Sequence, residues 1–290
     1  MRVFTGCVQR AEELTPAMRR VVLGGAGLAG FTTTGVGDEY VRLIFPAPGS
    51  SEPILPTVTG DCLDYDSIDL ATMRTYTVRD FDAAAGEVTI DFVVHDGGVA
   101  AQWARGAAPG DLIGINSPDG MYSPPAGFTW QILVADCAAL PAAARLLAGS
   151  PDTVRSRVVL EVPDSEHCLR LEAPANAEVT WVYGGNGQGP SRLEEIVRAL
   201  PRPDGVGYIW VAGEAKALRG VRKFLRRELG LPSTAYKTVG YWTASAESWR
   251  ERYEALDDAV KAELDAMWET AADIGEIEIE YDERLARLGL

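Results

Sequence analysis

The sequence has few of the residues that build metal clusters and disulfide frameworks. Its 290 residues include four cysteines and two histidines, and no Cys-x-x-Cys pair or other zinc or iron–sulfur spacing joins them. We therefore expect no protein-bound metal and no built-in iron–sulfur cluster, and disulfides would be unusual. The four cysteines, Cys7, Cys62, Cys137 and Cys168, stand far apart in the chain, and the two histidines, His95 and His167, are also distant from each other.

Long apolar runs and positive charge are also scarce. No stretch approaches the roughly 18–20 apolar residues of a membrane-spanning helix, and the N-terminus lacks the apolar segment of a secretory signal. Lysine and arginine number 27 against 42 aspartates and glutamates, a net charge of −15. This excludes binding of nucleic acid or of an anionic membrane over a broad surface. We expect a cytoplasmic protein without integral membrane association, acting as a monomer.

What is present indicates two domains. The length suits two domains and the 47% hydrophobic content supplies their cores. Residues 1–125 read as strands with short turns, which predicts a small antiparallel β-barrel. Residues 47–70 within it, rich in Pro, Ser, Gly and Asp, read as a long loop. The predicted strands cover residues 2–12, 17–23, 39–45, 74–80, 87–95 and 112–115, with a short helix over 99–104.

Residues 126–290 alternate strands with helices, which predicts an α/β domain with a mostly parallel sheet. The predicted strands cover residues 129–135, 156–162, 178–183, 208–212 and 235–241. Aromatic and aliphatic residues at helical spacing predict one long amphipathic helix over 247–271. An earlier helical segment carries five basic residues between Arg219 and Arg227, and we expect them to form a face exposed to solvent.

The hexapeptide Arg74–Arg79 (RTYTVR) is the most informative motif. Side chains alternate along a strand, so Arg74 and Tyr76 share one face. An arginine fork binds phosphate oxygens, and a tyrosine ring packs on a flat aromatic system. A flavin nucleotide offers both groups, and Thr77 adds a hydroxyl for its polar edge. Taken alone, the motif fits an edge strand in solvent better.

A second segment, His95–Asp111, ends a strand, passes through two glycines and starts a helix. Amides at a helix start favour phosphate through unpaired donors and the helix dipole, and Gly97 and Gly98 let backbone approach a ligand closely. Trp103 is expected to face the core. A Gly-Gly pair before a helix is usually only a turn, but with Arg74 nearby it could converge on one pyrophosphate.

Together these segments resemble the siderophore-interacting protein family, flavin-dependent ferric-siderophore reductases of the ferredoxin-reductase superfamily. The resemblance extends over nearly the whole chain and implies a flavin-binding barrel followed by a nicotinamide-binding α/β domain. It is carried by Arg74–Arg79, His95–Asp111, Ala139–Ala142, Trp210–Glu214 and Gly240–Trp242.

The resemblance implies FAD as the cofactor and NADH or NADPH as the electron donor. The residues implied for FAD are Arg74, Tyr76, Thr77, Val78, His95, Gly97, Gly98, Val99, Ala100 and Trp103. Those expected near NAD(P)H are Asp136, Cys137, Gly213 and Glu214. Basic residues near strand ends and the final helix, suited to an anionic ferric chelate, are Lys216, Lys237 and Arg250.

The chain departs from the family at two of these places. Where the family often has Gly-Pro-Ala-Ser, this chain has Gly98–Ala101, which loses a hydroxyl but keeps the amide donors. Where the family often has Gly-Asp-Glu-Thr-Ala, this chain has Ala135–Ala139, with Cys137 and Ala138 replacing a charged and a hydroxylated residue. The second departure bears on the pyridine nucleotide and leaves reduced ferredoxin as an alternative donor.

The sequence thus predicts an enzyme that reduces ferric siderophore with electrons from a flavin and releases iron. Siderophores are hard oxygen ligands that match Fe(III) better than Fe(II), and the cofactor performs the electron transfer. No protein residue is therefore assigned as a catalytic acid or base. The alternatives are another flavin reductase, such as one serving an oxygenase, and a non-catalytic siderophore- or flavin-binding protein.

Overall fold

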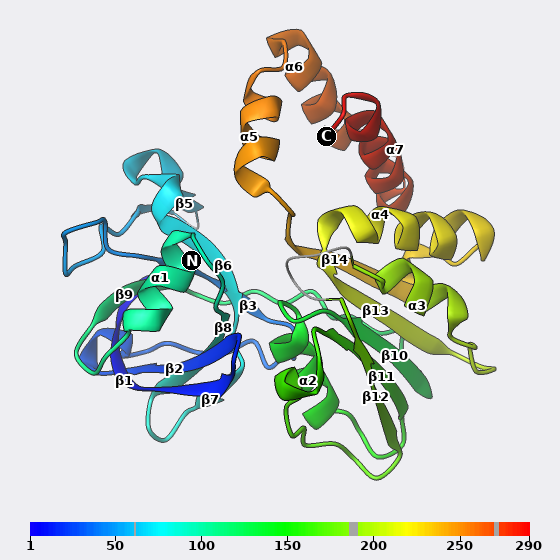
Figure 1. Ribbon diagram of the computed structural model, residues 1–290, viewed down its shortest axis with the longest axis horizontal. Helices are drawn as coiled ribbons and strands as arrows, with labels where there is room; N and C mark the ends of the chain where they lie inside the picture. The colour runs from blue at the N-terminus through cyan, green and yellow to red at the C-terminus, as the bar shows by residue number, and fades with distance from the viewer. Residues whose placement is uncertain (61, 186–190, 270–272) are drawn as a thin grey trace. The chain divides into compact units, whose positions relative to one another are not determined.

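The computed structural model describes residues 1–60, 62–185, 191–269 and 273–290, and Figure 1 shows its elements. The chain forms two compact units. The first comprises Met1–Tyr122, Cys137–Asp152 and Val162–Ala177. The second comprises Ser123–Asp136, Thr153–Glu161 and Glu178–Leu290. The domain boundary placed between residues 125 and 126 stays a prediction.

The first unit is built on a seven-stranded antiparallel sheet of order β6-β3-β9-β1-β2-β8-β7. The sheet curls so that β6 contacts β8, as in the predicted barrel. A turn at Pro16 joins the first two strands. The strands are β1 (Val3–Thr15), β2 (Met18–Gly24), β3 (Tyr40–Ile44), β6 (Met73–Thr77), β7 (Asp80–Asp82), β8 (Glu87–Val93) and β9 (Leu112–Asn116).

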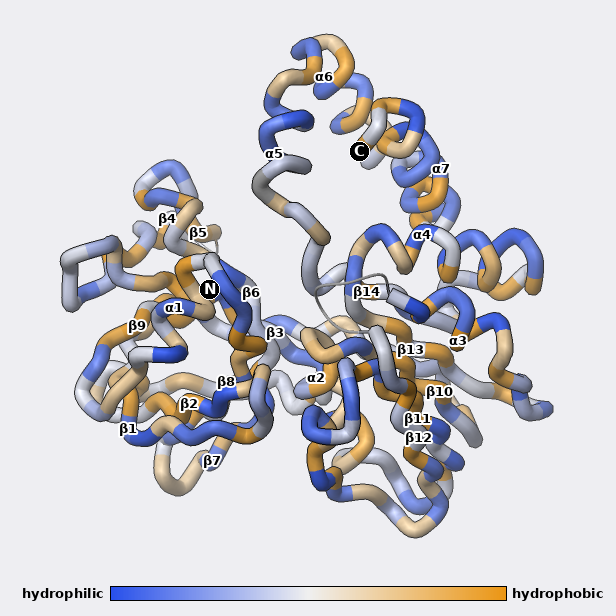
Figure 2. Tube along the Cα trace, in the orientation of Figure 1, coloured by the Kyte–Doolittle hydropathy of each residue, from blue (hydrophilic) through white to orange (hydrophobic). Residues whose placement is uncertain are grey.

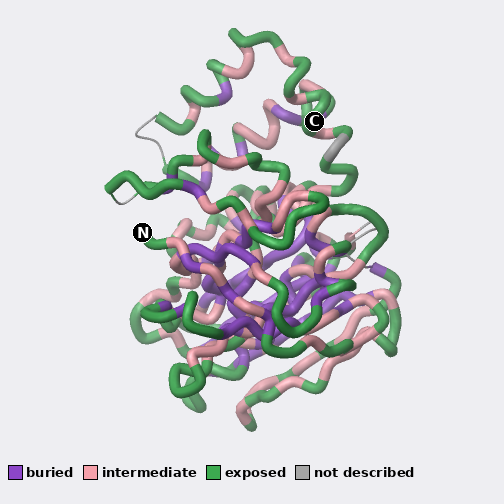
Figure 3. The backbone as a smooth tube through the Cα atoms, turned by 90° about the vertical axis from the view of Figure 1, so that its left-hand side faces the viewer, coloured by how far each residue is buried: buried purple, intermediate pink, exposed green. Residues whose placement is uncertain are grey.

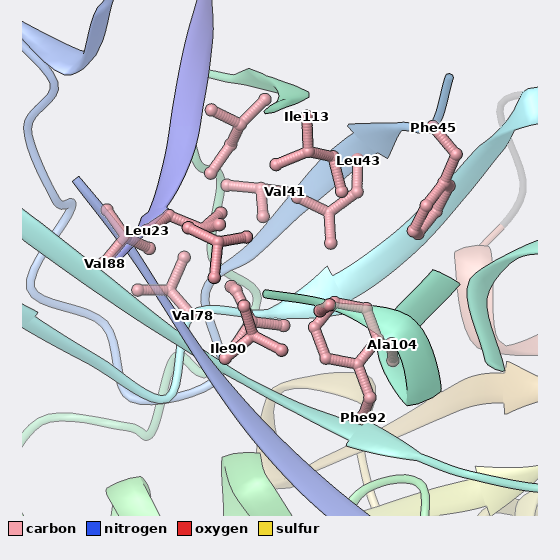
Figure 4. Packing of buried hydrophobic residues seen from close by; sticks show 14 of the residues in the cluster. Leu23, Val41, Leu43, Phe45, Val78, Val88, Ile90, Phe92, Ala104 and Ile113 are labelled. Atoms are coloured by element: carbon pink, nitrogen blue, oxygen red, sulfur yellow. The ribbon is translucent and has the colours of Figure 1, made fainter. Parts of the chain in front are cut away.

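Strand alternation creates the core of this sheet. Along β1, buried and half-buried residues alternate from Val3 to Val8, the pattern of a strand with one face inside. Figure 4 shows the side chains that the other strands send into the same interior, among them Leu23, Val41 and Ile90. The helix α1 (Val99–Gly106) covers part of this core through Ala100 and Ala104.

The segment predicted as a loop over residues 47–70 carries two very short strands, β4 (Thr57–Thr59) and β5 (Cys62–Asp64). Two 3-10 turns follow, at Tyr65–Ser67 and Leu70–Thr72. Asp64 and Asp69 cap these turns by accepting bonds from Asp66 N and Ala71 N. The second turn leads directly into β6.

The second unit contains a five-stranded sheet of order β12-β11-β10-β13-β14, in which β10 pairs in parallel with β11 and β13. Hydrophobic residues predominate along its central strands (Figure 2), and every residue of β10 is buried. The predicted antiparallel barrel followed by a parallel α/β domain is confirmed. The elements are β10 (Trp130–Ala135), β11 (Arg155–Val162), β12 (Ala177–Tyr183), β13 (Gly207–Glu214), β14 (Tyr236–Trp242), α2 (Leu140–Ala148), α3 (Leu193–Ala199) and α4 (Ala215–Lys223).

The prediction of one long helix over residues 247–271 is wrong. The structure has α5 (Ala246–Glu254) and α6 (Asp258–Ala266), and then α7 (Ile274–Arg287), which the sequence analysis missed; residues 270 and 271 lie outside the described part. α5 ends at Glu254, and Asp257 caps the start of α6 by accepting a bond from Ala259 N. These helices are mostly exposed or half-buried (Figure 3). No described helix is long and apolar enough to cross a bilayer.

The basic face predicted to be solvated instead binds α7. Arg222 forms two bonds to Asp282 Oδ2, at 2.8 Å through Nε and 2.5 Å through Nη2. Both side chains are only 12% exposed. The other basic residues of this face form a row of ion pairs with α7: Arg226 pairs with Glu276 at 3.0 Å, and Arg227 pairs with Glu283 at 2.7 Å. The π-helical turn η5 (Phe224–Glu228) carries these last two arginines. The ion pairs therefore attach α7 to α4 and η5.

Arg222→Ala should lower the free energy of unfolding by about 3 kcal/mol, because it removes both close bonds of the buried Asp282 carboxylate and leaves it only Arg219, at 3.5 Å. Arg227→Ala is the matched control. Its side chain and that of Glu283 are 36% and 37% exposed, so a loss below about 1 kcal/mol is expected. Urea unfolding and amide exchange across residues 274–287 measure both effects. Equal losses in the two variants would contradict this account of the row.

Candidate functional site

The strand β6 carries the Arg74–Thr77 motif. Its register with β3 places Tyr76 opposite Val41 and Arg74 opposite Leu43. Arg74 Nη1 donates to the carbonyls of Ala71 at 3.0 Å and of Met73 at 2.7 Å. These two bonds orient the guanidinium, which carries five donors in all and so keeps capacity for an anion.

Tyr76 lies at the edge of an aromatic cluster. The centroid of its ring is 4.4 Å from that of Phe92 on β8, and the ring centroids of Phe92 and of Trp103 on α1 are 5.7 Å apart. Burial raises the pKa of Tyr76, an effect that the nearby Arg74 charge opposes, so the phenol stays neutral. Trp103 also packs on Phe45 at 5.5 Å, which confirms that it faces the core. The cluster links β6, β8 and the helix α1.

The start of α1 has the donor set of a phosphate site. Gly97 and Gly98 both have positive φ, 84° and 79°, and a Cβ on Gly97 would meet no atom within 4 Å. Among the described residues, no side chain caps the helix at Gly98, and its first turn has no acidic residue. Its first amides therefore have no acceptor from a capping side chain, which fits a pyrophosphate group. His95 lies beside this start, its Cε1 3.6 Å from the Cβ position of Gly98.

The structure brings most residues predicted for FAD to this region, Arg74, Tyr76 and Thr77 on β6 and Val99 and Ala100 in the first turn of α1. Val78 differs, because its side chain is fully buried and its backbone groups are bonded. Its N–H donates to Glu39 O at 2.9 Å, and its carbonyl accepts from Arg145 Nη1 at 2.5 Å. In this structure Val78 fixes the end of β6 through its buried side chain and its two backbone bonds, and its contact with FAD stays a prediction.

The sequence analysis missed Glu39 and Arg145. Glu39 is fully buried and forms an ion pair with Arg145 at 2.7 Å. One signal was available: two consecutive acidic residues, Asp38 and Glu39, directly precede an apolar strand. Buried carboxylates are almost always paired, so such a position indicates a distant cation, although the sequence cannot say which one.

Three of the four residues predicted for NAD(P)H meet at the carboxyl ends of β10 and β13. Asp136 Oδ2 accepts from Glu214 N at 2.9 Å and from Trp242 Nε1 at 2.7 Å. Gly213 is required there, because a Cβ would lie 2.4 Å from that same oxygen. Glu214 Oε2 caps α4 at Ala217 N. Since the strand order reverses at β10, this edge is a topological switch point, where α/β sheets bind ligands.

The remaining predicted positions are more dispersed. Cys137 is buried at the start of the loop into α2. Residues 186–190 lie outside the described residues; directly after them, Ser191 Oγ donates to the buried Glu161 at 2.7 Å. The basic residues predicted for the substrate stand on three elements: Lys216 exposed on α4, Lys237 half-buried on β14 and Arg250 exposed on α5.

Two family models of known proteins match the chain. The family model described as the siderophore-interacting FAD-binding domain matches residues 7–122, and that of the siderophore-interacting protein matches residues 128–245. The two models together span the antiparallel and the parallel sheet.

Named relatives cover most of the chain. An NADPH-dependent ferric-chelate reductase of Escherichia coli is 30% identical, over 82% of this chain and 91% of that protein. The ferric vibriobactin reductase ViuB of Vibrio cholerae is 30% identical, over 86% and 93%. A crystal structure of a siderophore utilization protein from T. fusca superimposes with a TM-score of 0.75 and 34% identity, over 84% of this chain and 94% of that one.

Gly98→Ala should weaken FAD binding about tenfold or more, because φ 79° and ψ 138° are strained by about 1–3 kcal/mol for a residue with a Cβ and the first amides would shift. Gly106→Ala is the matched control at the other end of α1, where a Cβ would meet nothing within 4 Å. Titration of the apoprotein with FAD, followed by flavin fluorescence, compares them. An unaltered affinity in Gly98→Ala would show that phosphate does not bind at this helix start.

Proposed function

Because the chain belongs to the siderophore-interacting protein family, we propose that it is an FAD-dependent reductase of ferric siderophores. It takes electrons from NADH or NADPH, reduces chelated Fe(III) to Fe(II) and so releases iron in the cytoplasm, acting as a monomer. The observation that carries the proposal is the linkage of β6, with Arg74 and Tyr76, to the uncapped start of α1 through one aromatic cluster.

Arg74 and the helix start hold the cofactor's phosphates in this proposal. Arg74, oriented by the carbonyls of Ala71 and Met73, binds phosphate oxygens through its planar fork. The amides of Val99 and Ala100 bind the pyrophosphate with the help of the helix dipole. The neutral Tyr76 ring packs against the flavin, and Thr77 lies near its polar edge. FAD, when bound, accepts a hydride and passes on two electrons one at a time.

The electron donor binds at the switch point of the parallel sheet. Gly213 and the tethered Asp136 shape the carboxyl ends of β13 and β10, and Cys137 and Glu214 flank them. A pyridine nucleotide suits this crevice. Two electrons from one NAD(P)H reduce two ferric ions. Reduced ferredoxin is the alternative donor, favoured by Cys137 and Ala138, which differ from the residues usual in the family.

The substrate is an anionic iron chelate. Lys216, Lys237 and Arg250 supply positive charge in a chain whose net charge is −15, so local cations must outweigh a repulsive surrounding field. Reduction weakens the chelate because hard oxygen donors hold Fe(II) less tightly than Fe(III). The iron is substrate throughout, carried by its chelator.

The deciding experiment mixes the FAD-loaded protein anaerobically with a ferric siderophore, an Fe(II)-trapping dye and NADH, NADPH or reduced ferredoxin. We expect coloured Fe(II) complex with at least one donor, at two iron ions per NAD(P)H oxidised. A yellow protein that yields no trapped Fe(II) with any donor would defeat the reductase function and favour a siderophore- or flavin-binding carrier. A chain that takes up no FAD would exclude every flavin function.

Arg74→Ala should weaken FAD binding by about 10- to 100-fold, because hydrogen bonds to a charged group contribute about 1.5–3 kcal/mol. Arg74→Lys should restore only part of the affinity, since an ammonium lacks the planar fork. Arg105→Ala, at an exposed arginine paired with Asp96 near the end of α1, is the control for lost positive charge. Isothermal titration of each apoprotein measures the binding, and an Arg74→Ala protein that binds FAD like the control would show that the phosphates lie elsewhere.

A further inference from the structure

A buried ion pair stands at the end of the strand that carries Arg74 and Tyr76. Glu39 accepts hydrogen bonds from the Thr33 hydroxyl and from Thr34, at 2.6 Å from the amide and 2.5 Å from the hydroxyl. Arg145 completes the set at 2.7 Å. Burial by itself raises the pKa of Glu39, but the threonine bonds and the Arg145 charge outweigh it and hold that pKa below its usual value. Glu39 is therefore ionised at neutral pH.

Both residues of the pair bond to the backbone of Val78, Glu39 through its own main-chain carbonyl and Arg145 through its guanidinium. Val78 N donates to Glu39 O at 2.9 Å, while Val78 O accepts from Arg145 Nη1 at 2.5 Å. Val78 directly follows Thr77 and is two residues from Tyr76. A shift of the Glu39 backbone or of the Arg145 side chain therefore reaches the proposed flavin strand through one residue, Val78.

The other end of the connection is the helix α2. Arg145 belongs to α2, which begins at Leu140, immediately after the loop Cys137–Ala139. Gly37 lets α2 come close to the residues before β3, because a Cβ there would lie 2.7 Å from Leu146 Cδ2 and 3.0 Å from its Cα. Substantial movement of α2 along this surface would break the Glu39–Arg145 contact.

We propose that Glu39 and Arg145 are positioning residues, which hold the flavin strand and the loop Cys137–Ala139 in the register needed for the nicotinamide to reduce the flavin. The inference rests on the proposed function. In the step concerned, the nicotinamide C–H bond breaks and its hydride, two electrons with one proton, passes to the flavin and leaves NAD(P)⁺. Neither residue touches the reacting atoms. Such a transfer is sensitive to placement, since about 1 Å of displacement can cost about 10²-fold in rate.

The test compares three variants as FAD-loaded proteins: Arg145→Met, Arg145→Lys and the double variant Glu39→Gln/Arg145→Met, which buries no unpaired charge. For Arg145→Met we expect the first-order rate of FAD reduction at saturating NAD(P)H to fall about 10- to 100-fold. The nucleotide dissociation constant should change by less than about threefold. Arg145→Lys should recover part of the rate because it restores the charge but not the bond geometry.

Two readouts separate positioning from general damage. Reduction of the bound FAD by dithionite needs no docked nucleotide, so its rate should match wild type in all three variants. In the apoprotein, the Val78 amide and the first turn of α2 should exchange hydrogen at least about tenfold faster in Arg145→Met. Arg20→Met is the matched control: it breaks the Arg20–Asp91 pair, whose carboxylate is also fully buried, on β2 and β8. It should leave the rate of reduction by NAD(P)H unchanged.

Different results overturn either the inference alone or the proposed function together with it. The inference alone is overturned if the Arg145→Met protein holds FAD and NAD(P)H reduces that FAD at the wild-type rate. It is also overturned if reduction by dithionite slows as much as reduction by NAD(P)H. If Arg145→Met does not retain FAD, the double variant carries the measurement. Loss of FAD from both assigns the pair to cofactor retention and also overturns the inference. A wild-type protein that holds FAD but is reduced by neither NADH nor NADPH refutes the donor in the proposed function, and the inference falls with it.

Discussion

The ion pair between Glu39 and Arg145 is the interaction on which the arrangement of the first unit depends. A carboxylate taken out of water is costly unless charge and hydrogen bonds replace the lost hydration. Glu39 meets that requirement with two threonines and one arginine from a helix over 100 residues later in the chain. Its neighbour Asp38, also buried, accepts from Met121 N at 2.9 Å and Tyr122 N at 2.8 Å. Two adjacent carboxylates thus tie together three distant segments.

The second unit uses a buried carboxylate in the same way. Asp136 joins the end of β10 to the Glu214 amide on β13 and to the Trp242 indole on β14. Three parallel strands are therefore held together at the carboxyl edge of the sheet, where we propose that the electron donor binds. In both units the acidic groups stabilise the scaffold, while the redox chemistry belongs to the cofactor. This division explains why no side chain had to be assigned as an acid or base.

Local patterns predicted most of the fold, and long-range pairing accounts for what they missed. Strand alternation and buried apolar runs placed nearly every strand within a few residues, because these patterns depend on which face is inside. The row from Arg219 to Arg227 was misread because α7, its partner, lies some 50 residues further on. The single predicted final helix failed because Asp257 caps a new helix inside an apolar stripe that continues across the break. Arg74 and Gly98 were predicted from local chemistry, whereas a partner for Glu39 such as Arg145 becomes visible only in the folded chain.

The attachment of α7 also shapes how the molecule meets charged ligands. Five of the 27 basic residues, between Arg219 and Arg227, face carboxylates of α7 and its N-terminal cap. Four carboxylates, those of Asp273, Glu276, Asp282 and Glu283, offset most of this charge, so it adds little to the outward field of a protein with net charge −15. Anions such as nucleotides and iron chelates thus approach against long-range repulsion and are captured only at short range. Added salt screens that repulsion within about 10 Å at 0.1 M, so ionic strength would speed encounter here, the reverse of electrostatic steering.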